Sequence, residues 1–231
     1  MLMCVSGADS ITELPHQGFI CRTQPNSKLQ MRVASEFMIA EGAKSMAWIG
    51  PQTPFAASSI AIMEEVGAAN GASMADLIYE ADKSTYRSEV DQILRANPDF
   101  ILLGGYSVLL RDIWQSGYEG QLIGPAYAVN ASLLEALPDE VTEGVFTWEG
   151  APAVDSGAYA NVKAILGVDD VDPYSALTLD HASLTLLAMA AGGDSTGDTV
   201  RQSVRTISQG DGMVVETAVV GLEALSGGIN F

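Results

Sequence analysis

The chain has 231 residues, of which 48% are hydrophobic and 17% are charged, and its formal net charge is −18. This length and composition allow one large domain or two modest ones with a sizeable core, and they exclude a chain that is disordered by composition. The acidic balance repels phosphate backbones, so we expect no nucleic-acid partner. No apolar run approaches the roughly 20 residues of a membrane-spanning helix.

The chain begins with two short predicted strands, 2–5 and 19–22, and a helix follows them. Ser27 and Gln30 have the spacing of a capping box, which predicts that this helix starts at Ser27. Gly42 suits the helix end. Four apolar residues recur in this helix at helical spacing: Leu29, Val33, Phe37 and Ala40.

Strands and helices then alternate regularly. The predicted strands are 45–49, 73–79, 100–103, 122–124 and 144–148. The predicted helices between them are 56–69, 86–96, one that ends at Ser116, and 130–137. Repeated β-α units of this length predict an α/β fold with a doubly wound parallel sheet and right-handed crossovers. After a break at 149–152 the chain is predicted to be mostly helical, with helices at 174–191, 199–208 and 217–225.

Catalytic and metal-binding patterns are absent from this sequence. It contains no GxSxG elbow, no Walker A loop and no GxGxxG after a strand. Asp180 and His181 are adjacent on a helix and point in different directions, which favours a structural role over a base with its orienting carboxylate. Cys4 and Cys21 belong to no CxxC pair or Cys/His cluster. We therefore expect no enzyme, no cofactor and no metal; a disulfide is geometrically open, and two buried free thiols are the favoured alternative.

Small or aromatic residues follow four of the predicted strands. These segments are Ser6–Ser10, Gln52–Phe55, Gly104–Tyr106 and Pro125–Tyr127. Ligands of open α/β sheets bind outside the carboxyl ends of the strands. Any one segment could be core packing, but four at corresponding positions favour a small-molecule cleft with aromatic walls.

The sequence resembles the substrate-binding proteins of branched-chain-amino-acid-type ABC transporters, which have the type I periplasmic binding fold. The resemblance spans nearly the whole chain and rests on the order and spacing of seven segments: Cys21-Arg22-Thr23-Gln24-Pro25, Glu41-Gly42-Ala43-Lys44-Ser45, Asn97-Pro98-Asp99 with Gly104-Gly105-Tyr106, Ile123-Gly124-Pro125, Asn130-Ala131-Ser132-Leu133, Glu143-Gly144-Val145, and Pro173-Tyr174-Ser175-Ala176-Leu177 with Asp180.

The resemblance implies two α/β lobes that close on a ligand. Residues 27–148 would form the second, C-terminal lobe, and residues 1–26 and 149–231 part of the first. Family members begin upstream with a signal peptide and further β-α units and continue beyond the last residues here, so we expect both terminal parts to be missing. An incomplete lobe leaves sheet edges uncovered, which predicts self-association or pairing with another chain.

The resemblance also assigns ligand-binding residues. The family's loop before the first crossover falls on Ala8, Asp9 and Ser10, where Asp9 disfavours a ligand carboxylate and suits an amine or hydroxyl. Phe55 stands where a tyrosine is typical, and Tyr106 matches the second-lobe aromatic residue. The acid that commonly pairs with an amino-acid ammonium is replaced by Ala126, beside Tyr127, which puts an α-amino-acid ligand in doubt.

We therefore predict an extracytoplasmic solute receptor of an ABC importer. Its partners would be a small ligand, such as an amino acid or a related amide, carboxylate or aromatic compound, and an inner-membrane permease. The alternative is a ligand-sensing regulatory domain of the same fold in a signalling protein. A small α/β enzyme is disfavoured by the absent motifs.

Overall fold

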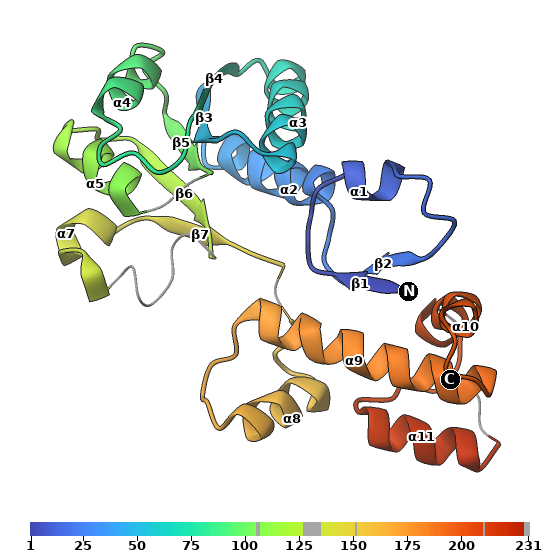
Figure 1. Cartoon of the computed structure of the whole chain (residues 1–231). Coiled ribbons are helices and arrows are strands. Elements are labelled where there is room, and N and C mark those ends of the chain that lie inside the picture. The colour runs from blue at the N-terminus through green and yellow to red at the C-terminus, as the bar shows by residue number, and fades with distance from the viewer. Residues whose placement is uncertain (105–106, 127–134, 151, 210, 229–231) are drawn as a thin grey trace. The chain divides into compact units, whose positions relative to one another are not determined.

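The computed structural model describes residues 1–104, 107–126, 135–150, 152–209 and 211–228. It contains two compact units, which are described separately (Figure 1). Unit 1 comprises Met1–Pro25 and Gly150–Phe231, and unit 2 comprises Asn26–Glu149.

Unit 2 is built on a five-stranded, all-parallel sheet with the strand order β4-β3-β5-β6-β7. Its strands are β3 (Ser45–Pro51), β4 (Ser73–Tyr79), β5 (Phe100–Leu103), β6 (Gln121–Pro125) and β7 (Phe146–Trp148). All four residues of β5 are buried, as expected for a central strand that is covered on both faces. The structure confirms the parallel sheet that the sequence predicts.

The helices of unit 2 cover both faces of this sheet (Figure 1). They are α2 (Ser27–Ala40), α3 (Pro54–Asn70), α4 (Arg87–Leu94), α5 (Ser107–Gln115) and α7 (Asp139–Thr142). On one face α2 and α3 bury a core around Met31, Met63 and Trp48. On the other, α4 and α5 bury Val90 and Ile113 against alternate strand residues.

Two helices of unit 2 begin at residues whose side chains cap the first turn. The hydroxyl of Thr53 accepts a hydrogen bond from the N–H of Ala56 at 3.1 Å, and Pro54 occupies the first turn of α3. Helix α2 begins at Ser27 as predicted, but Ser27 is not its N-cap. Asn26 is the N-cap of α2, and its side-chain oxygen accepts from the N–H of Leu29 at 2.9 Å.

The sequence also misplaces the buried face of α2. Leu29 and Val33 are 55% and 60% exposed, whereas Met31, Ala34 and Met38 are buried. The buried stripe combines Met31 and Met38 with small or polar residues such as Ala34 and Ser35, so Leu29 and Val33 form the more obvious apolar pattern in the sequence. Trp114 of α5, which matches the helical spacing, is likewise 48% exposed.

Unit 1 combines a two-stranded parallel sheet with five helices in its described residues. Its elements are β1 (Leu2–Cys4), α1 (Ser10–Glu13), β2 (Ile20–Arg22), α8 (Gly157–Leu166), α9 (Pro173–Gly192), α10 (Gly197–Gln209) and α11 (Ala218–Ser226). The short helix α1 and the helix α8 lie where the sequence predicts no specific element. The long helix α9 packs against α8, α10 and α11.

The parallel register of β1 and β2 bears on the two cysteines. Met3 is the partner of Cys21, and Cys4 is the partner of Arg22. Because successive side chains of a strand alternate between faces, Cys4 and Cys21 point to opposite faces of the sheet. Both cysteines are free, as the favoured alternative predicts, but they are half-buried and not buried.

None of the described helices is both long enough and apolar enough to cross a bilayer.

Candidate ligand-binding site

The predicted second-lobe residues follow strands of unit 2 at their carboxyl ends. Phe55 lies in the first turn of α3, directly after β3, and is half-buried. Ala126 follows β6, and its N–H donates to the carbonyl of Trp148 at 3.1 Å. Tyr106 and Tyr127, which we also predict to bind ligand, lie outside the described residues.

Two glycines bring β3 and β5 unusually close at this end of the sheet. A Cβ added to Gly50 would lie 2.8 Å from the Cα of Gly104, and one added to Gly104 would lie 2.5 Å from Cζ2 of Trp48. Real Cβ atoms essentially never approach other atoms that closely. The indole of Trp48 therefore lies directly over Gly104, in space that a larger residue at position 104 would fill.

Three aromatic side chains then form a row on the α2/α3 side of the sheet. The ring centroids of Trp48 and Phe55 are 6.0 Å apart with tilted planes. Those of Phe55 and Trp148 are 6.1 Å apart, and their planes differ by only 12°. We call Trp48, Phe55 and Trp148 the aromatic trio. Phe55, which we expected to stack on a ligand, has these two protein rings as neighbours.

Both indole N–H groups of the aromatic trio lack a hydrogen-bond acceptor among the described residues. Nε1 of Trp48 and Nε1 of Trp148 are both inaccessible to solvent. Trp48 is 1% exposed as a whole, while Trp148 is half-buried. A buried donor without an acceptor destabilises the fold by about 1–3 kcal/mol, so two in one cluster need an explanation.

In unit 1 the predicted ligand-binding loop Ser6–Ser10 follows β1. The guanidinium of Arg22, from the end of β2, donates to the carbonyls of Ser6 at 3.0 Å and Ala8 at 3.1 Å. It also donates to the hydroxyl of Thr12 at 3.3 Å. Arg22 thereby ties the first part of the loop and the helix α1 to the end of β2.

Asp9, in the middle of this loop, is 4% exposed. Its Oδ2 atom is buried without a hydrogen-bond partner among the described residues, and the side chain does not cap α1. Oε1 of Gln24, also in unit 1, is in the same condition. Ala8 is buried and Ser10 is exposed. The structure thus leaves an acceptor oxygen of Asp9 available to a donor.

Asp180 and His181 are adjacent residues of α9, and both have shifted pKa values. Nε2 of His181 lies 2.9 Å from the hydroxyl of Thr23. Burial raises the pKa of Asp180, which the charge of His181 lowers in part. Burial also lowers the pKa of His181, against the opposing effect of Asp180. The imidazole is thus engaged with Thr23, consistent with the structural role expected from the sequence.

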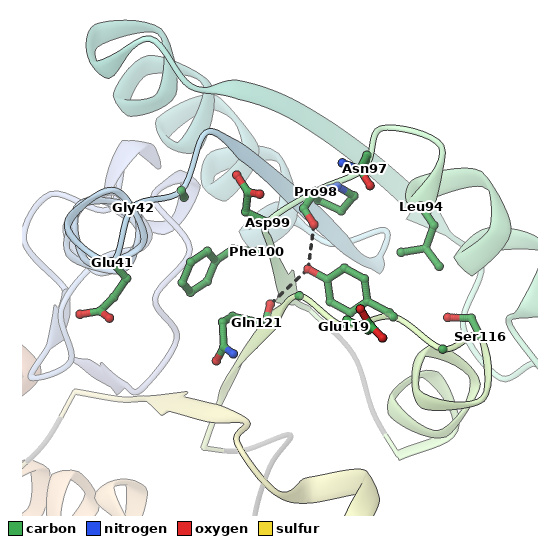
Figure 2. A pocket seen from close by; sticks show the side chains of 14 residues that line it. Glu41, Gly42, Leu94, Asn97, Pro98, Asp99, Phe100, Ser116, Glu119 and Gln121 are labelled. Atoms are coloured by element: carbon green, nitrogen blue, oxygen red, sulfur yellow. Dashed lines mark hydrogen bonds between the residues drawn. The ribbon is translucent and has the colours of Figure 1, made fainter.

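Unit 2 also contains a hollow of about 680 Å³ at the amino ends of β5 and β6 (Figure 2). Asp99 lines it and accepts from the N–H groups of Lys44 at 2.7 Å and Ser45 at 2.9 Å. The phenol of Tyr118 donates to the carbonyl of Pro98 at 3.1 Å, and burial raises its pKa. These groups are engaged in holding the loops together, and the hollow lies at the end of the sheet opposite to the aromatic trio.

A second hollow, of about 980 Å³, lies within unit 1 and is mostly apolar. Residues of β2, α8, α9, α10 and α11 line it, among them Cys21, Asp180 and Arg205. Burial raises the pKa of Cys21, and the nearby Arg205 opposes that shift. No group of three or more His, Cys, Asp or Glu side chains in the described part of the chain could hold a metal ion.

Sequence reasoning missed three residues of these sites: Trp48, Trp148 and Arg22. Trp148 is the last residue of a predicted strand, so its position at the carboxyl end was a signal that could have been used. Trp48 lies inside a strand, where a tryptophan is ordinarily core. Its unpaired N–H depends on packing that the sequence does not reveal.

Comparisons with known proteins agree with this architecture. Residues 2–221 match the family model described as periplasmic binding protein. The chain is 27% identical over 215 residues to the chemotactic signal transduction system substrate-binding protein BasB of Halobacterium salinarum, covering 85% of this chain and 48% of that protein.

Solved structures give the same fold at low identity. A leucine-binding protein from Thermotoga maritima has a TM-score of 0.74 and 17% identity, over 82% of this chain and 57% of that one. A solute-binding protein of an ABC transporter from R. palustris, in complex with benzoate, has a TM-score of 0.73 and 18% identity, over 87% and 58%.

The chain spans about half to three fifths of the length of these relatives. The family and the fold are those of solute-binding receptors. The family match over residues 2–221, together with the parallel sheet and the shared fold, shows that this chain belongs to the periplasmic binding protein family.

Proposed function

We propose that this chain is part of an extracytoplasmic solute-binding receptor that captures a small organic ligand for an ABC importer. In this proposal unit 2 is the second lobe, and unit 1 is part of the first. Ala8, Asp9 and Ser10 would contribute to ligand binding from unit 1, and Phe55, Tyr106 and Tyr127 from unit 2. The permease of the importer would be the protein partner.

The observation that carries the proposal is the distribution of polar groups near the predicted ligand-binding segments. Asp9 has a buried oxygen without a partner among the described residues, and Arg22 fixes the loop around it. A carboxylate in that condition suits a donor such as an ammonium or hydroxyl group, since a buried charge requires a partner. The solved solute-binding proteins of the same fold support the same function.

A thermal-shift screen of amino acids, amides and aromatic acids would identify a ligand, and calorimetry would then measure its affinity. We expect Tyr106→Ala to weaken binding at least about tenfold, since an aromatic wall contributes burial as well as ring contacts. Asp9→Asn should weaken binding of an amine ligand, because the charge-assisted hydrogen bond is lost.

Tyr118→Ala is the matched control, because Tyr118 precedes β6 and its hydroxyl binds the carbonyl of Pro98, which precedes β5. Thermal unfolding of each variant would separate a loss of affinity from a loss of folding. Unchanged affinity in both Tyr106→Ala and Asp9→Asn would overturn these assignments.

A second candidate is supported by the similarity to BasB, whose name places it in chemotactic signal transduction. In this alternative the receptor presents its ligand to a signalling protein. Deletion of the gene distinguishes the two, since a transport role predicts lost ligand uptake and a signalling role predicts lost swimming bias toward the ligand.

A further inference from the structure

The aromatic trio combines apolar surface with two unused hydrogen-bond donors. Both Nε1 atoms, of Trp48 and of Trp148, are buried and have no acceptor among the described residues. The two indoles flank the same ring, that of Phe55, at 6.0 and 6.1 Å. Both unused donors therefore belong to one small aromatic cluster.

The position of the Trp48 ring requires small residues around it. Gly104 and Gly50 leave space for the Trp48 ring, where a Cβ would collide with it or with the neighbouring strand. Trp148 ends β7 beside Pro125 of β6, at the carboxyl ends of the strands. Ligands of parallel α/β sheets bind at this end, and indoles usually find a partner for their N–H when buried.

We propose that the aromatic trio recognises a hydrogen-bond acceptor of the ligand, a carbonyl or carboxylate oxygen, through the indole N–H groups of Trp48 and Trp148. This inference rests on the proposed solute-binding function and specifies part of the ligand. The ligand in this inference bears an oxygen acceptor for unit 2.

A neutral donor suits this protein. The formal net charge of −18 opposes the approach of an anion, and an indole N–H binds an oxygen without adding a charge. We therefore expect a carbonyl oxygen, as in an amide, to bind more tightly than a carboxylate of the same shape.

Three probes that share a phenyl ring test this point: benzamide, benzoate and benzylamine. They present a neutral acceptor, an anionic acceptor and a cationic donor. The protein has three tryptophans, Trp48, Trp114 and Trp148, so a ¹⁵N-labelled sample should give three indole N–H signals, each assigned from a Trp→Phe variant. Trp114 is exposed on α5, outside the trio, and serves as the internal reference.

We expect benzamide, and more weakly benzoate, to move the signals of Trp48 and Trp148 downfield while that of Trp114 stays in place. Benzylamine should leave the trio signals unmoved. Trp148→Phe and Trp48→Phe should each weaken binding of benzamide at least about tenfold in calorimetry, whereas Trp114→Phe should not.

Calorimetric binding of benzamide or benzoate without movement of either trio signal would overturn the inference and leave the proposed function standing. Absence of binding heat and of signal movement with both acceptor probes would count against the inference and the proposed function together. A larger shift with benzylamine than with benzamide would reverse the assigned ligand chemistry. The signal movements are read in the unsubstituted protein, and the Trp→Phe variants are needed only to assign the three signals.

Discussion

Replacement of Gly104 by alanine should destabilise unit 2 through a single collision. The new Cβ would lie 2.5 Å from Cζ2 of Trp48, whereas ordinary contacts begin at 3.4 Å. Gly104 does not have a positive φ, so the backbone tolerates alanine and the effect is purely steric. Trp48 is 1% exposed and has little room to move.

Overpacking of this kind destabilises a core by about 1–3 kcal/mol. For a protein of this size we expect Tm to fall by about 2–12 °C, at about 2–4 °C per kcal/mol. All three tryptophans belong to unit 2, so tryptophan fluorescence follows the unfolding of that unit alone.

A double-mutant cycle separates the collision from other effects. Phenylalanine lacks the outer ring atoms of Trp48 that approach Gly104, so Trp48→Phe should relieve the collision. The double variant should therefore be more stable than the sum of the two single changes predicts, by about 1 kcal/mol or more. An unchanged Tm in Gly104→Ala, or strict additivity in the cycle, would refute the close approach of Trp48 to β5.

Three further predictions concern stability and thiol chemistry. Asp112→Ala should destabilise unit 2 by about 1–3 kcal/mol in urea unfolding, because the buried carboxylate accepts from the N–H of Tyr86 at 2.5 Å and from the hydroxyl of Thr85 at 2.9 Å; a change below about 0.5 kcal/mol would contradict this role. Raising NaCl from about 0.1 to 1 M should raise Tm, since it shortens the Debye length from about 10 to 3 Å and screens the repulsion within a chain of net charge −18. A lower Tm at high salt would contradict a destabilising role of this repulsion. Cys4 and Cys21 should both be alkylated in unfolded protein without reductant, since both are free thiols. In folded protein the alkylation of Cys21 should accelerate as pH rises, because burial raises its pKa and the thiolate is the reactive form. Protection of both thiols until a reductant is added would show a disulfide and contradict the first expectation.

Much of the fold follows from the sequence because local signals and burial agree. The strands Ser73–Tyr79 and Phe100–Leu103 are predicted to the residue, since each is a short apolar or alternating run between clear turn signals. Prediction failed on α2, where Leu29 and Val33 formed the more obvious apolar stripe. That helix instead buries Met31, Ala34 and Met38 in the core that it shares with α3, a tertiary effect that periodicity alone does not reveal.

The candidate site was less predictable than the fold. Strand order and family pattern indicated Asp9 and Phe55, but they could not indicate that the oxygen of Asp9 lacks a partner among the described residues. They also could not indicate that Trp48 lies over Gly104. Whether a buried polar atom has a hydrogen-bond partner depends on how all the surrounding side chains pack, and a sequence pattern does not contain that information.

The most direct test of the proposed function is an isothermal titration of the unsubstituted chain with benzamide, benzoate and leucine. We predict a saturable isotherm with a stoichiometry of about one for at least one of them, as expected for a binding site with few convergent polar groups. The absence of saturable heat with all three would contradict the claim that this chain binds such a ligand.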